Sequence, residues 1–257
     1  MTTDVTRTSE ASVARFVGEL QVEQLDTLRL RGNPSGGPRP RVFGGIVLAQ
    51  ASLAAARTVD RERSQHSLHA YFLRGGSNEL PISYVVTIDR DGRTFSARHV
   101  TALQDGDVIC DLMLSFVRPQ DGIEHADPMP EVPPPEACEP QHWEPPPGID
   151  PETRPMWPFE AREVTPDRIA EPGEDPSDVV WLRLRSPLPD DQLIHTAALV
   201  CESDSGSLGA VWRRHGPFAP RSSASLDHAL WLHRPVRWDD WLLFVTTSPV
   251  AHSARAL

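Results

Sequence analysis

An aspartate in the second half of the chain is a candidate for acid–base chemistry. Asp204 lies in the segment ESDSGSL, directly after an apolar run that favours a helix. Burial beside such a helix would raise the pKa of the carboxyl group and make it a stronger base for activating water. The alternative is a carboxylate that only ends the helix or faces solvent, and both interpretations stay open at this point.

A second set of candidate residues lies at the start of a helix predicted for Phe43–Arg57, FGGIVLAQASLAAAR. Gly44 and Gly45 would let a ligand come close to the backbone N–H groups of the first helical turn. Gln50 is nearly alone among apolar neighbours, so its amide must either bond within the core or contact a ligand. Gly44, Gly45 and Gln50 are therefore candidate substrate-binding residues.

Nucleophilic chemistry has less support. No G-x-S-x-G segment presents a reactive serine, so histidines that could complete a Ser-His-Asp triad are interpreted as structural. These histidines are His66, His69, His228 and His233.

Cysteine usage and net charge limit the possible partners. Cys110, Cys138 and Cys201 are far apart and include no C-x-x-C pair, which argues against disulfides and a zinc site. A formal charge of −11 argues against nucleic-acid binding, and no apolar run is long enough for a signal peptide or a membrane span. We expect a cytoplasmic protein with reduced thiols, no metal and no cofactor.

The elements that must position these residues can be read from hydrophobic patterns. The helix from Ile46 to Ala56 has almost no polar face, so it must be buried on every side. The residues before it predict a frayed segment over 1–15 and a strand within Phe16–Arg31. Strands follow the helix, with two hairpin turns at Asp91-Gly92 and Asp105-Gly106. The predicted strands are His66–Leu73, Pro81–Asp89, Thr94–Leu103 and Asp107–Val117.

Half of the 26 prolines lie between Pro119 and Pro158, which predicts a linker. After this linker the order of strands and helix recurs. A strand is predicted at Val179–Arg185, a helix at Leu193–Leu208 and another strand at Ala229–His233, so the chain is an internal duplication. The second copy ends soon after Ser253-Ala254-Arg255, whereas a whole hairpin follows Ser96-Ala97-Arg98 in the first. We therefore expect a marginally stable second copy.

Several segments in the right order resemble the acyl-CoA thioesterase II family. They include RVFGGIVLAQA (Arg41–Ala51), HSLHAYFLRGG (His66–Gly76), RDGRTFSARHV (Arg90–Val100), ESDSGSL (Glu202–Leu208) and SLDHALWLHRP (Ser225–Pro235). The resemblance implies an α+β double hotdog, in which two antiparallel sheets each wrap around a long central helix. We expect modules over 16–118 and 164–257, joined by a proline-rich linker over 119–163, and a homo-oligomer.

The resemblance also implies hydrolysis of fatty acyl-CoA to free acid and CoA. It maps an Asp that activates water onto Asp204 and a hydroxyl residue onto Ser225, which could otherwise be an ordinary turn hydroxyl. The family's catalytic Gln has no counterpart, so weak or absent turnover is expected, and an acyl-CoA-binding protein without activity is the alternative. A hydratase is less favoured because no G-D-x-N-P-x-H segment is present. Candidate cations for the CoA phosphates are Arg74, Arg98, Arg221, Arg234 and Arg255.

Overall fold

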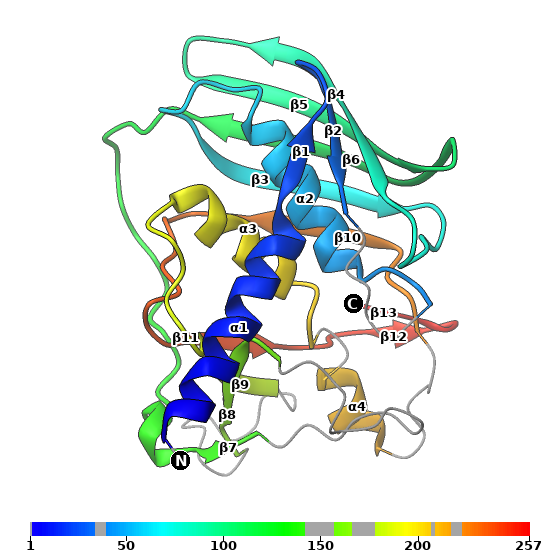
Figure 1. Ribbon diagram of the computed structural model, residues 1–257. Coiled ribbons are helices and arrows are strands. Elements are labelled where there is room, and N and C mark those ends of the chain that lie inside the picture. Colours follow the sequence, from blue (N-terminus) through cyan, green and yellow to red (C-terminus); the bar gives the residue numbers. More distant parts are fainter. Residues whose placement is uncertain (1, 34–39, 142–156, 166–177, 207–208, 217–222) are drawn as a thin grey trace.

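The computed structural model describes residues 2–33, 40–141, 157–165, 178–206, 209–216 and 223–257 (Figure 1). The helices are α1 (Thr2–Leu20), α2 (Gly44–Ala56), the 3-10 turn η1 (Pro135–Ala137), α3 (Gln192–Glu202) and α4 (Gly209–His215). The strands are β1 (Val22–Gln24), β2 (Arg29–Gly32), β3 (Ser64–Phe72), β4 (Ile82–Asp91), β5 (Phe95–Gln104), β6 (Asp107–Val117), β7 (Glu139–Pro140), β8 (Phe159–Glu163), β9 (Asp178–Leu184), β10 (Asp227–Trp231), β11 (Leu242–Thr246), β12 (Ala251–His252) and β13 (Arg255–Ala256).

The α2 helix is the centre of the fold. Every residue from Gly45 to Ala55 is buried, which confirms the expectation that this helix has no solvent face. Strands β4, β5 and β6 contact it from one side, and α1 and α3 contact it as well. In Figure 1, α2 lies beneath the large sheet while α1 crosses close to α3. Its apolar sequence therefore matches an environment made of protein on all sides.

The large sheet has seven strands in the order β1-β2-β4-β5-β6-β3-β10, all antiparallel to their neighbours. Both predicted hairpins are present, β4–β5 and β5–β6. The turn at Asp105-Gly106 has φ values of 48° and 85°, a conformation that favours glycine at the second position. On β6, Cys110, Leu112, Leu114 and Phe116 are buried, as the alternating pattern predicts.

The two halves of the chain share one core. Strand β10 comes from the second half, yet it pairs with β3 of the first half from Asp227–Tyr71 to Trp231–Ser67. One hydrophobic cluster continues from α2 and β3–β6 through α3 to Phe159 and Trp238. The second sheet is smaller, with the order β11-β9-β8-β7. In the described part of the chain, no strand pairs with the outer edge of β10 or of β11.

The N-terminal prediction was wrong. Residues 1–15 were expected to fray and Phe16–Arg31 to contain one strand, but α1 extends to Leu20 and two short strands follow. Val13, Phe16 and Leu20 are all buried at spacings of three and four residues, which is the helical period. Leu20, Val22, Leu28 and Leu30 also lie on one alternating phase, so the helix end resembled a strand in the sequence.

The linker is shorter than expected. Strands β7 and β8 lie within the range 119–163, and β8 pairs with β9 from Phe159–Leu184 to Glu163–Val180. The second sheet therefore begins before residue 164. Residues 142–156 of the proline-rich stretch lie outside the described residues. Among the described residues, no helix is long and apolar enough to span a membrane.

Candidate active site

The start of α2 meets the end of α3, and two glycines make this approach possible. A Cβ atom on Gly45 would lie 2.2 Å from the carbonyl oxygen of Cys201, and one on Gly44 would lie 2.7 Å from Oδ2 of Asp204. Any larger residue would separate the two helices. The pair Gly44-Gly45 therefore lets a carboxylate lie directly on the N-terminal end of α2, where the helix dipole is positive.

Asp204 is that carboxylate. It follows the C-terminal residues of α3, and its side chain is only 6% exposed. Burial raises the pKa of Asp204 from its ordinary 3.8 to about 6, while hydrogen bonds from the Ser225 hydroxyl and the Gly45 backbone N–H act in the opposite direction. A carboxylate with this pKa is ionised at neutral pH yet more basic than a solvated one, which suits a general base.

Ser225 reaches the same place from another element. The Phe72 backbone N–H at the end of β3 donates to Leu226 O, which holds the chain leading into β10 beside the start of α2. From there the Ser225 hydroxyl donates to Oδ1 of Asp204 at 3.3 Å. The structure thus brings together four of the residues expected from sequence: Gly44, Gly45, Asp204 and Ser225.

His228 also lies at this site, although the sequence favoured a structural role for it. Its Nδ1 is 3.9 Å from Oδ1 of Asp204, and its Nε2 is 3.0 Å from Oγ of Ser203. The imidazole is thus next to the carboxylate on one side and to a hydroxyl on the other.

Comparison with known proteins identifies the family of this chain. Residues 34–117 match the acyl-CoA thioesterase N-terminal domain, and residues 156–257 match the acyl-CoA thioesterase family model. Human acyl-coenzyme A thioesterase 8 is 33% identical over 264 residues, covering 93% of this chain and 80% of its own. Acyl-CoA thioesterase 2 of Haemophilus influenzae is 32% identical over 249 residues, covering 93% of this chain and 87% of its own. The chain belongs to the acyl-CoA thioesterase family.

Solved structures support the same assignment. An acyl-CoA thioesterase II of Mycobacterium marinum superposes with a TM-score of 0.77 and 39% identity, over 93% of this chain and 86% of the other. A protein from Alicyclobacillus acidocaldarius described as having the hot dog fold gives a TM-score of 0.70 at 20% identity, over 92% of this chain and 87% of the other. The α+β double-hotdog fold expected from the sequence is confirmed.

Gln50 has a different environment from the other predicted site residues of this thioesterase-family chain. It is fully buried, and its Nε2 donates to Glu19 O at 2.7 Å and to Asn33 O at 3.2 Å. Its Oε1 accepts from the Tyr84 hydroxyl at 2.8 Å. These bonds hold the end of α1 and strand β4 against α2. They favour the core-amide alternative over a ligand contact.

Glu202 is a residue of the site that sequence reasoning missed. It is the last residue of α3 and is only 4% exposed. Burial raises the pKa of Glu202 from 4.5 to about 8, while a hydrogen bond from the Ser205 side chain lowers it and the charge of Asp204 raises it. The signal was available in the sequence, because an acid directly after the apolar run LVC can remain in the helix and be buried with it.

The arginines expected to bind phosphate differ in their exposure to solvent. Arg98 is 1% exposed, and its guanidinium donates to Asp91 Oδ1 at 2.8 Å and to Thr58 Oγ1 at 2.8 Å, so this candidate was wrong. Arg221 lies outside the described residues. Arg74 and Arg234 are exposed, at opposite ends of the β3–β10 pair.

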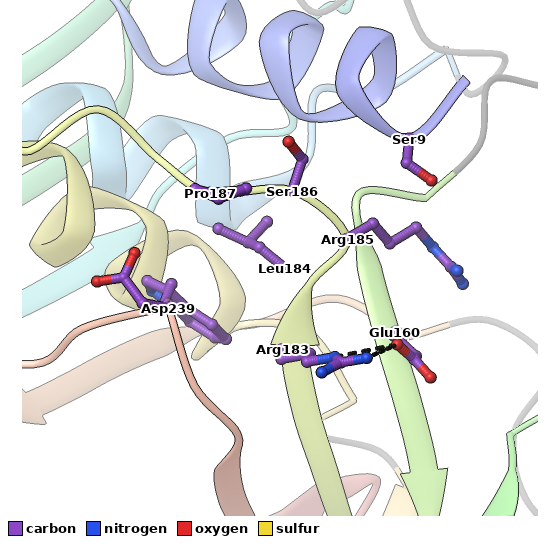
Figure 2. Close-up of a pocket in the computed structure, with 9 residues that line it drawn as sticks. Ser9, Glu160, Arg183, Leu184, Arg185, Ser186, Pro187 and Asp239 are labelled. Atoms are coloured by element: carbon purple, nitrogen blue, oxygen red, sulfur yellow. Dashed lines mark hydrogen bonds and ion pairs between the residues drawn. The ribbon is translucent and has the colours of Figure 1, made fainter. Parts of the chain in front are cut away.

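A pocket of about 320 Å³ opens elsewhere, between α1 and the β8–β9 pair (Figure 2). Figure 2 shows Arg183 and Glu160 facing each other across its floor, with Ser9 of α1 above them. The Glu160 carboxylate accepts from Arg183 at 2.9 Å and from Arg162 at 2.7 Å, so its charge is already compensated. None of the residues around Asp204 lines this pocket. It is therefore separate from the candidate active site.

Proposed function

We propose that this chain hydrolyses acyl-CoA thioesters to free acid and CoA, with Asp204 as the base that activates water. The observation that carries the proposal is the buried Asp204 carboxylate on the N-terminal end of α2, hydrogen-bonded to Gly45 and Ser225. Membership of the acyl-CoA thioesterase family supports the substrate class. We assign the carboxylate the role of a base because its raised pKa suits it to take a proton from water.

The reaction needs one proton to move twice. Asp204 takes a proton from water while the hydroxide oxygen bonds to the thioester carbonyl carbon. The tetrahedral intermediate then breaks its C–S bond, and the CoA sulfur takes the proton from Asp204, which restores the carboxylate. A base with a pKa near 6 can perform both steps at neutral pH.

The negative charge that develops on the carbonyl oxygen also needs a donor. The first turn of α2 supplies backbone N–H groups at the positive end of the helix dipole. Gly45 N–H is already bonded to Asp204, so Gly44 N–H is the group that we assign to the oxyanion. Gly44 thus has the substrate-binding role expected from the sequence, while the Gly45 N–H holds Asp204 instead.

Two exposed arginines near the start of α2 suit the CoA phosphates. Arg41 packs against Gly75, since a Cβ on that glycine would lie 3.2 Å from Arg41 Nε. Arg74 donates from Nη1 to Val108 O at 2.9 Å, which holds its side chain beside β6. Within the described residues, neither guanidinium is paired with a carboxylate. Because the protein carries a net charge of −11, such local cations are where an anionic ligand would bind.

The test is release of CoA from acyl-CoA by the purified chain, followed by thiol titration. Asp204→Asn should lower kcat by about 10²–10⁴-fold, because the amide keeps the shape but cannot take a proton. Asp190→Asn is the matched control, since that carboxylate is 92% exposed at the other end of α3. Thermal protection by acyl-CoA without any CoA release would instead favour a binding protein. Unchanged turnover in Asp204→Asn would remove Asp204 from the mechanism.

We also propose a homo-oligomer in the cytoplasm. The outer face of the large sheet exposes Tyr71 at 64%, Trp231 at 57% and Met113 at 46%, an apolar area that a second copy could cover. Cys110, Cys138 and Cys201 are all buried and unpaired, as in a reducing compartment. Light scattering after gel filtration tests the oligomer, and a monomer at micromolar concentration would exclude it.

A further inference from the structure

His228 connects the two halves of the site. It lies on β10, where it pairs with Ala70 of β3, and its side chain is 15% exposed. The imidazole reaches from the large sheet to the end of α3, where Ser203 and Asp204 follow one another. Its Nε2 is 3.0 Å from Ser203 Oγ and its Nδ1 is 3.9 Å from Asp204 Oδ1.

The Ser203 hydroxyl determines which imidazole nitrogen carries hydrogen. A serine hydroxyl has one hydrogen, and Ser203 donates it to the carbonyl oxygen of Val200 at 2.8 Å. Its oxygen therefore faces His228 Nε2 as an acceptor, so Nε2 must be the protonated nitrogen. Burial lowers the pKa of His228, against a smaller opposing effect of Asp227, which favours the neutral ring. In the neutral ring, Nδ1 is then a bare acceptor that faces Asp204.

Two acceptors at this separation define a site for water. The 3.9 Å between Nδ1 and Oδ1 is too long for a direct hydrogen bond, and both atoms present lone pairs. A water oxygen about 2.8 Å from each atom would donate one hydrogen to each and direct its own lone pairs away from both. We infer that the attacking water is held between Asp204 Oδ1 and His228 Nδ1, with Ser203 fixing the histidine tautomer.

This inference rests on the proposed hydrolysis and assigns the residues that orient its nucleophile. Asp204 takes one hydrogen of the water as the oxygen bonds to the carbonyl carbon. The other hydrogen stays on that oxygen throughout and remains hydrogen-bonded to His228 Nδ1. His228 is thus a catalytic residue that contacts the water, while Ser203 is a positioning residue that acts through His228.

Two substitutions separate this role from a structural one. His228→Asn places an amide oxygen near the position of Nδ1 and can still accept from the water. His228→Gln places its amide near the position of Nε2, where it can keep the bond to Ser203 but leaves nothing for the water. We expect kcat to fall within about tenfold in the Asn variant and by about 10²-fold in the Gln variant, with KM little changed in both.

The matched controls are His69→Asn and His69→Gln, because His69 is exposed on β3 in register with Ala229 of β10. A structural role predicts the opposite order, with Gln close to wild type and Asn impaired, and that order would overturn the inference. Absence of CoA release from the wild-type chain would instead overturn the proposed function itself.

A measurement on the wild-type chain keeps the inference testable if a variant fails to fold. In ¹⁵N-histidine-labelled protein at neutral pH, His228 should show hydrogen on Nε2 and none on Nδ1. Ser203→Ala should change this ratio of tautomers, whereas Ser205→Ala should not. A protonated Nδ1 in the wild-type chain would exclude the proposed water site.

Discussion

The buried Glu202 allows a quantitative test of the site's electrostatics. Its pKa is about 8 in the folded chain, against an ordinary 4.5, because burial disfavours the charged form. Between these values the folded state holds a proton that the unfolded state has released. The free energy of unfolding must therefore fall as pH rises through this window. Below the ordinary value both states are protonated, and the effect disappears.

The magnitude follows from the two pKa values. Each pKa unit corresponds to about 1.4 kcal/mol, so ionisation of Glu202 should remove about 4 kcal/mol of stability from about pH 5 to about pH 9. That is a large part of the 5–15 kcal/mol that stabilises a typical domain, taken here as a rough reference. Glu202→Gln removes the titration, so the variant should lose about 4 kcal/mol less than wild type over the same range.

Urea unfolding followed by tryptophan fluorescence measures this difference, since Trp238 is buried in the core. The comparison is between pH dependences, so a constant change caused by the new amide cancels. Glu79→Gln, at an exposed position, controls for the same change of charge. Asp204, with its pKa of about 6, leaves a smaller slope in both proteins. Parallel curves for wild type and Glu202→Gln would show that Glu202 is charged or solvated in the folded chain.

Three further predictions concern activity and packing. Because Asp204 must be ionised to act as a base, kcat/KM should fall as pH drops below about 6, and this ionisation should be absent from the residual activity of Asp204→Asn. Gly45→Ala would place a Cβ 2.2 Å from the Cys201 carbonyl oxygen, so urea unfolding should show a loss of about 1–3 kcal/mol or more, with little loss for an alanine at exposed Gly122. Arg41→Ala and Arg74→Ala should each raise KM for acyl-CoA roughly threefold to tenfold, and this increase should be smaller at high salt. Arg234→Ala, at the opposite end of β3, should leave KM unchanged.

Hydrophobic pattern predicted the centre of this fold but not its N-terminus. A helix without a polar face, such as α2, can only be buried, and the hairpins β4–β5 and β5–β6 follow from local turn residues. The end of α1 could not be assigned in the same way, because Leu20 fits both a helical and an alternating pattern. Its helical partners Val13 and Phe16 become informative only when the surface that they cover, on α2 and α3, is known.

The site shows the same division between local and long-range information. Asp204 and Ser225 were found through a family resemblance, whereas their contact depends on β10 joining a sheet from the other half of the chain. His228 was assigned a structural role because no G-x-S-x-G segment presents a reactive serine, and its partner Ser203 lies 25 residues earlier in the chain. The Ser203 hydroxyl, just after α3, takes part in both hydrogen bonds that fix the tautomer of His228. It donates to Val200 O and accepts from His228 Nε2.

The burial of acids at this site also has a physical cost that the fold must offset. Glu202 and Asp204 are both largely buried, and each has its pKa raised by burial. The same helix contact that raises the pKa of Asp204 is therefore destabilising above the ordinary pKa values of the two acids. The close packing of α2 on α3, which needs Gly44 and Gly45, supplies the compensating burial. Substitutions that remove a buried charge here should raise the free energy of unfolding and lower turnover together. The same trade-off between stability and activity is expected wherever burial raises the pKa of a base.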